Sequence, residues 1–203
     1  MFPLGCYDRM VQEIKRREDK DIPVTFGILI ADYRHQINRE YILNYIERFN
    51  YRSDQYINFY LPGYLEGSRN CNNEKIIIDN KEYYFSANVY DEFLRKLEMD
   101  FYIDYPYIPV LLLLEYANGN FNMCNKIYID LDSESLNIKK TGNMFDKIFS
   151  IAQKEVNLQE IKNDLMKEEF KSGLLDRIIK AIDNSFILEI YDIGKKMRKY
   201  KVI

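Results

Sequence analysis

The chain has little of what most metal and nucleophile sites require. It contains one histidine and no tryptophan, and its three cysteines, at positions 6, 71 and 124, form no CxxC pair. Structural zinc modules usually pair their cysteines at CxxC-like spacing or use several histidines, so we expect no zinc module of this kind. An odd, sparse set of cysteines also fits a reducing compartment better than a disulfide framework.

Long apolar runs and a strong charge of one sign are missing as well. The most apolar run, IPVLLLL at 108–114, is too short to cross a bilayer, and the N-terminal segment lacks the apolar stretch of a signal peptide. We therefore expect a cytoplasmic protein with no membrane segment. The net charge of −3 argues against broad nucleic-acid binding, which needs a basic face. The one dense basic stretch, KKMRKYK at 195–201, is typical of a solvated tail.

Four common catalytic or nucleotide-binding signatures are absent: GxGxxG, GxxxxGK[ST], GxSxG and HExxH. The 47% hydrophobic and 30% charged residues are nevertheless those of a globular domain with a real core. We expect one α/β domain over 1–203, in which about 142–203 forms a mainly helical part packed on the rest.

The clearest positive pattern is strand, helix, strand. VTFGILIA at 24–31 is a continuous apolar run, typical of a strand buried on both faces. Apolar residues then recur at spacings of three and four from Ile37 to Phe49, which predicts an amphipathic helix. YINFYL at 56–61 predicts a second strand, ended by Pro62 and Gly63. This is the size of a βαβ unit and predicts a Rossmann-like start.

Later segments predict antiparallel pairs. KIIID and EYYFS, on either side of Asn80-Lys81, resemble a hairpin, and 63–74 is expected to be an exposed loop. Asn118-Gly119 is a strong hairpin signal between strands at 110–117 and 125–131. From Gly142 the pattern is helical, and 186–193 is either a final strand or more helix. The predicted class is therefore α/β, a mixed sheet with antiparallel hairpins and a helical C-terminal segment.

The predicted ligand site lies where the first two strands end. Ligands of open α/β sheets bind outside the carboxyl ends of the strands. Asp32, Tyr33, Arg34 and His35 follow the first predicted strand directly. Tyr64, Glu66 and Arg69 follow the second. Arg34 could form a fork with a phosphate or carboxylate, and Asp32 could bind a ribose hydroxyl. The alternative is that Asp32 caps the connection while Arg34 and His35 are solvated.

Glu92 is the second catalytic candidate, beside Asp32. A helix is predicted from Asn88 to about Asp100 with Val89, Phe93, Leu97 and Phe101 on its buried face. Asp91 and Glu92 would lie in its first turn, where carboxylates complement the helix dipole. Because Glu92 lies off the apolar line, it could project into a crevice as an acid or a base.

Two metal-dependent alternatives have less support. Asp130 and Asp132 alternate along a strand and could bind magnesium, although a solvated strand end explains the same residues and is the favoured interpretation. Asp79 and Glu82 resemble part of a nuclease metal site, but Tyr84 stands where that site needs a lysine. We therefore assign no metal ligands and identify no cofactor.

Two functions remain. The element order loosely resembles TIR-type and other Rossmann-like domains that handle NAD or nucleotides, although no motif of these families is present. The first hypothesis is therefore a domain that binds, and as a catalytic extension hydrolyses, a nucleotide-like small molecule at the strand ends. The second is a non-catalytic subunit or inhibitor that binds another protein through a tyrosine-rich surface and the C-terminal helices. Self-association is left open.

Overall fold

The structure is a computed structural model that describes residues 2–18, 23–53, 57–67, 75–101, 109–131, 138–152 and 157–172. Its main element is a five-stranded sheet of order β1-β3-β2-β7-β8. The strands are Phe2–Leu4 (β1), Asn58–Pro62 (β3), Val24–Ile30 (β2), Val110–Ala117 (β7) and Asn120–Asp130 (β8). The first three are parallel, and β7 runs antiparallel to both β2 and β8. The predicted mixed α/β sheet with a βαβ start is confirmed.

The two central strands are also the most apolar. All side chains from Phe26 to Ile30 and from Val110 to Tyr116 are buried. Such continuous burial is typical of strands that carry helices on both faces. Gly27 is required for close packing, because a Cβ there would lie 2.3 Å from the Phe59 ring.

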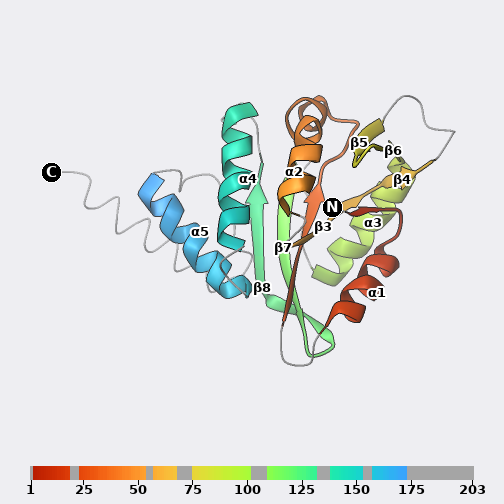
Figure 1. Ribbon diagram of the computed structural model, residues 1–203. Coiled ribbons are helices and arrows are strands. Elements are labelled where there is room, and N and C mark those ends of the chain that lie inside the picture. The colour runs from red at the N-terminus through yellow and green to blue at the C-terminus, as the bar shows by residue number, and fades with distance from the viewer. Residues whose placement is uncertain are drawn as a thin grey trace.

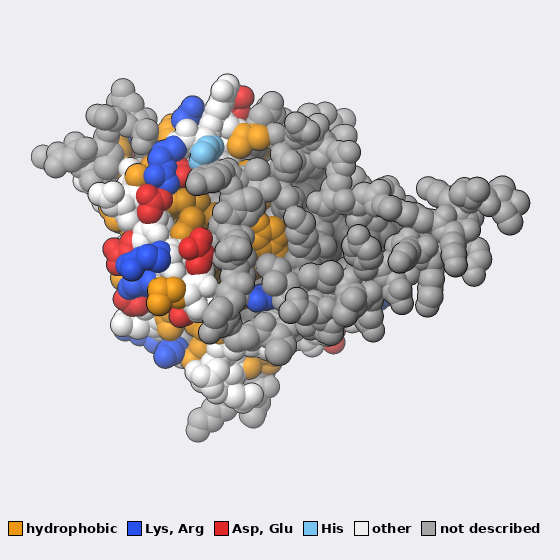
Figure 2. All heavy atoms as spheres, turned by 180° about the vertical axis from the view of Figure 1, so that it is seen from behind, with side chains coloured by type: hydrophobic (Ala, Val, Ile, Leu, Met, Phe, Trp, Pro, Cys, Tyr) orange, Lys and Arg blue, Asp and Glu red, His pale blue; other side chains and the backbone are white. Residues whose placement is uncertain are grey.

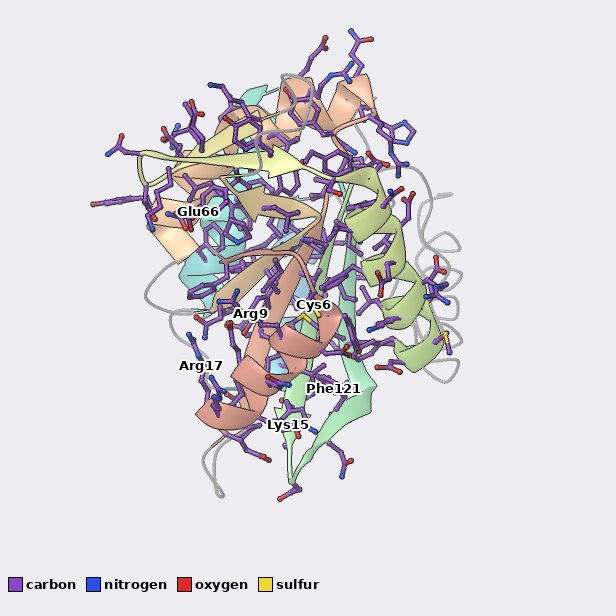
Figure 3. The ribbon with its side chains drawn as sticks, turned by 90° about the vertical axis from the view of Figure 1, so that its right-hand side faces the viewer. Cys6, Arg9, Lys15, Arg17, Glu66 and Phe121 are labelled. Atoms are coloured by element: carbon purple, nitrogen blue, oxygen red, sulfur yellow. The ribbon has the colours of Figure 1, made fainter. Side chains whose placement is uncertain are left out.

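Helices cover both faces of the sheet (Figure 1). Tyr7–Arg17 (α1) and Ala87–Phe101 (α3) lie on one face, where the rings of Tyr7 and Phe93 are 5.3 Å apart. Ile46–Ser53 (α2) and Ile138–Ala152 (α4) lie on the other, where Phe49 contacts Phe59 and Phe149. Leu158–Ser172 (α5) packs beside β8. Figure 3 shows Cys6 at the start of α1 and Arg17 at its end.

The crossover from β2 to β3 is helical as predicted but irregular. It contains a π-helical turn, Asn38–Ile42 (η1), and a 3-10 turn, Leu43–Tyr45 (η2), before α2 begins. Its apolar face is buried through Leu43, Ile46 and Phe49. π-Helical turns often occur at functional sites, and this one follows the predicted ligand site directly.

A small antiparallel sheet of order β4-β6-β5 follows β3. Its strands are Tyr64–Glu66 (β4), Lys81–Phe85 (β6) and Lys75–Ile78 (β5). The prediction of an exposed loop from residue 63 was therefore wrong at its start. Gly63 has a φ of +83° and turns the chain at once into β4, and a Cβ there would lie 2.7 Å from the Cβ of Tyr90. Only glycine accommodates both the backbone conformation and the close contact.

The hairpin between β5 and β6 is present, but its turn lies one residue earlier than predicted. Asp79 and Asn80 form the turn, with φ of 52° and 61°. A two-residue turn of this type needs positive φ at both positions, which Asp and Asn tolerate better than Lys81 would. The Asn118-Gly119 hairpin is confirmed, with φ of 54° and 78°.

Helix α3 begins one residue before the predicted cap, and the amide of Tyr90 donates to the carbonyl of Ser86 at 3.0 Å. Tyr90 takes the place predicted for Val89 on the buried face, together with Phe93, Leu97 and Phe101. The prediction that Asp91 and Glu92 lie in the first turn was wrong. Strand β1 was not predicted at all. Helices α4 and α5 confirm the helical character after Gly142, while 186–193 lies outside the described residues.

Candidate functional site at the end of strand β2

The connection after β2 is shaped by Asp32. The carboxylate of Asp32 accepts a hydrogen bond from the backbone amide of Arg34 at 2.8 Å, and its carbonyl accepts one from the amide of His35 at 3.2 Å. The side-chain amide of Asn38 donates to the same carbonyl at 2.8 Å. Asp32 is only 7% exposed, so these contacts are screened little by water. The residue therefore stabilises the turn that leads into the crossover.

Arg34 joins this turn to α3. Its Nε donates to both carboxylate oxygens of Asp32, at 3.0 and 2.8 Å, and its Nη2 lies 2.7 Å from Asp32 Oδ2. The other edge of the guanidinium forms a fork with Asp91: Nη1 donates to Oδ2 at 3.1 Å and Nη2 to Oδ1 at 2.6 Å. The hydrogen bonds to Asp32, and then those to Asp91, raise the pKa of Arg34 above its ordinary value. The guanidinium is charged and fixed in orientation.

Two aromatic rings support the guanidinium. The Cζ atom of Arg34 lies 5.9 Å from the ring centre of Phe85 and 5.8 Å from that of Tyr90. Such cation–π contacts add attraction and restrict movement of the arginine. Burial, and then the negative charge of Asp32, raise the pKa of Tyr90. Tyr90 is therefore a neutral wall of the site at physiological pH.

The remaining residues of the connection surround this core. Tyr33 stacks on Phe85 with ring centres 6.3 Å apart, and the guanidinium of Arg39 lies 5.7 Å from the ring centre of Tyr33. Arg39 also donates to the carbonyl of Tyr33 at 2.9 Å. The Nε2 atom of His35 lies 3.7 Å from Asp32 Oδ2, and the imidazole is partly exposed. The structure thus brings Tyr33, Arg34 and His35 together around Asp32.

The cluster does not include Tyr64, Glu66 or Glu92 in the way expected, and Glu66 is exposed and lies 3.6 Å from Lys81. Tyr64 is 1% exposed, and its hydroxyl donates to the carbonyl of Ala31 at 3.2 Å, so it supports the end of β2 from inside the core. Glu92 is exposed and lies 3.9 Å from Lys96, one turn along α3. Arg69 lies outside the described residues.

Most of the residues missed from the sequence come from elements distant in the chain, but Asn38 lies only six residues after Asp32. Asp91 supplies the second carboxylate, Phe85 and Tyr90 supply the rings, and Asn38 supplies a buried amide. The Oδ1 atom of Asn38 has no hydrogen-bond partner, although the residue is only 1% exposed. Among these residues only Asn38 had a local sequence signal, because an asparagine in the first turn of a helix can hydrogen-bond to the nearby backbone.

Metal ligation receives no support within the described part of the chain. Among the described residues, no group of three or more His, Cys, Asp or Glu side chains could hold a metal ion. Asp132 lies outside these residues, and Glu82 is hydrogen-bonded to Lys75 and Tyr84 instead. Within the same residues, no helix is long and apolar enough to cross a membrane.

Comparison with other proteins does not add to this picture. No protein-family model matches the chain, and neither a curated protein nor a solved structure matches it. The geometry at the end of β2 is therefore the basis for assigning a function.

Proposed function

We propose that the chain binds an anionic, nucleotide-like small molecule at the carboxyl ends of β2 and β3. The observation that carries this proposal is the orientation of Arg34. Asp32 holds the Nε side of the guanidinium, and the two Nη atoms form a fork, here bound to Asp91, at the edge of the sheet where α/β folds bind ligands. A planar fork of this kind matches a phosphate or a carboxylate.

Two neighbouring features favour a nucleotide over a simple anion. Tyr33 is partly exposed and lies among other planar groups, which suits stacking of a base. The Oδ1 atom of Asn38 is a buried acceptor without a donor, a state that costs about 1–3 kcal/mol. A donor from a ligand, or an ordered water, would remove that cost.

Hydrolysis has less support than binding. A pair of Asp32 and Glu92 would need both carboxylates to face one substrate, whereas Asp32 is bound to Arg34 and Glu92 lies beside Lys96. We therefore propose binding as the function and treat turnover as a separate measurement. Release of product from ATP or NAD, lost in both Asp32→Asn and Glu92→Gln, would establish the catalytic extension.

The test of binding is calorimetry and thermal shift with ATP, NAD and cyclic nucleotides. Arg34→Lys keeps the charge but removes the fork, and we expect at least tenfold weaker binding, since a charged hydrogen bond contributes about 1.5–3 kcal/mol. Arg9→Lys is the matched control, because Arg9 lies on α1 and is 72% exposed. Absence of binding to all of these nucleotides, or equal binding by Arg34→Lys, would refute the proposal.

A protein partner is the second candidate, and one observation favours it. Tyr51 at the end of α2 and Ile77 on β5 are 84% and 45% exposed, and a hydrogen bond from Asn50 to Asp79 links α2 to the turn that follows β5. Exposed apolar side chains on adjacent elements can form part of an interface. On the face seen in Figure 2, charges of both signs are interleaved over the described residues, so no one-signed patch there favours a nucleic-acid partner. A protein partner that co-purifies in stoichiometric amount would favour this candidate.

A further inference from the structure

We infer that Asp91 occupies the anion position of this site and competes internally with the anionic group of the ligand. The inference rests on the proposed function, and it names how the site is regulated. Two carboxylates bind the two edges of the Arg34 guanidinium, and they differ in burial. The side chain of Asp32 is 9% exposed, whereas that of Asp91 is 55% exposed.

Asp32 cannot leave the guanidinium without disrupting the turn. Its carboxylate also accepts the backbone amide of Arg34, and its carbonyl accepts the amide of Asn38. Removing this carboxylate would leave the partly buried backbone amide of Arg34 without its acceptor, which is costly. Asp32 is therefore the permanent partner that orients Arg34.

Asp91 has no such additional role. Both of its hydrogen bonds go to the Nη atoms of Arg34, and its backbone belongs to the regular helix α3. An exposed ion pair contributes only about 0–1 kcal/mol, so a change of side-chain rotamer is enough to release the fork at small cost. The carboxylate binds both Nη atoms, as a carboxylate or phosphate of a ligand would.

The consequence is a site that is closed by its own chain when no ligand is present. The fork of Arg34 and Asp91 links residues 57 apart in sequence and holds the turn after β2 against α3. A ligand that takes the fork must displace Asp91, and its apparent affinity falls by the fraction of molecules in which the fork is open. Groups with more negative charge, such as pyrophosphate, compete better than a single carboxylate.

Asp91→Asn tests this inference, because it preserves the shape of the side chain and removes the charge. Calorimetry with ATP and with inorganic pyrophosphate should give about fivefold tighter binding than the wild type, the factor that corresponds to an exposed ion pair. Glu98→Gln is the matched control. It removes the same charge from an exposed position farther along α3, and it should leave the affinity unchanged.

The outcomes separate the two proposals. If the wild type binds ATP but Asp91→Asn binds it equally or more weakly, internal competition is wrong and the binding site stands. An equal gain in affinity in Glu98→Gln would also overturn the inference, because the effect would then come from the lower net negative charge of the protein. If neither the wild type nor Asp91→Asn binds ATP or pyrophosphate, the proposed function itself fails. Urea unfolding of each variant checks that the fold is retained.

Discussion

Two buried carboxylates lie at opposite ends of the same sheet and are used differently. Glu115 on β7 is 6% exposed, and it pairs in register with Thr25 at the start of β2. Its carboxylate accepts the side-chain amide of Asn122 at 2.9 Å and the backbone amide of Leu158 at 3.2 Å. Asp32, beyond the other end of β2, binds a guanidinium that reaches the surface. Burial alone does not distinguish these two carboxylates, whereas the exposure of their partners does.

The surroundings of Glu115 explain why we assign it a structural role. Leu158 is the first residue of α5, and Asn157 accepts the amide of Glu160 at 2.9 Å as an N-terminal cap. Glu115 therefore satisfies another amide at the positive end of this helix, where a carboxylate is stabilising. It links α5 and β8 to β7.

The largest expected effect comes from Glu115→Ala. The substitution leaves the amide of Leu158 buried without an acceptor, so the free energy of unfolding should fall by about 2–4 kcal/mol. Urea unfolding measures this change. Glu115→Gln keeps one acceptor oxygen, so its free energy of unfolding should lie between those of the wild type and Glu115→Ala. Nucleotide affinity should be unchanged in folded protein. A loss of affinity in Glu115→Gln would break the distinction between the two ends of the sheet.

Asp32→Asn should have a smaller effect on stability and a larger one on binding. Asparagine keeps an acceptor for the amide of Arg34, so the free energy of unfolding should fall by about 1–2 kcal/mol. The guanidinium loses the charge that orients it, and affinity for ATP should fall at least tenfold. Unfolding and calorimetry on the same samples give both values. Unchanged affinity would mean that Asp32 is structural, as Glu115 is.

The smallest effect at neutral pH is expected for Tyr60→Phe. The hydroxyl of Tyr60 is buried between the sheet and α1 without a hydrogen-bond partner, whereas the hydroxyl of Tyr64 donates to Ala31 near the site. Removing an unsatisfied hydroxyl should change the free energy of unfolding at pH 7 by about 0.5 kcal/mol or less, whereas Tyr64→Phe should lower it by about 1 kcal/mol. Unfolding of both variants by urea compares them directly.

Tyr60 also predicts a dependence on alkaline pH. Burial raises the pKa of Tyr60 from 10.0 to about 12, while Arg17 lowers it and Glu13 raises it. The neutral hydroxyl is therefore favoured by folding, and this contribution is complete below pH 10 and is lost as the pH rises toward 12. The wild type should lose about 2 kcal/mol relative to Tyr60→Phe over this range. Parallel pH profiles of the two proteins would contradict this ionisation.

Local patterns were sufficient for most of the main sheet. The apolar run of β2 predicted a central strand because burial on both faces leaves few polar positions, and the apolar run of β7 predicted a strand. Asn118-Gly119 predicted its turn because both residues accept positive φ. Strand β1 was missed because FPL carries no periodicity of its own and is a strand only through pairing with β3.

The candidate site could be predicted only in part. The position of Asp32, Tyr33, Arg34 and His35 followed from the end of β2. Tyr64 was expected to face a ligand, but Gly63 turns it back into the core. Glu92 was chosen over Asp91 because it lies off the apolar line predicted for this helix, Val89, Phe93 and Leu97. The start of α3 and the packing of Tyr90 determine instead that Asp91 faces Arg34.

The sequence by itself determined the strand–helix–strand start, the Asn-Gly hairpin and the polar segment after β2, since hydrophobic period and turn chemistry act over a few residues. Only the tertiary structure decided which carboxylate meets Arg34, which rings lie beneath it and that Tyr64 is buried. Those contacts depend on how α3 and β6 pack against the end of β2, and packing is set by residues far apart in the chain. A change of one position along α3 rotates its side chains by about 100°, so local pattern cannot decide between Asp91 and Glu92.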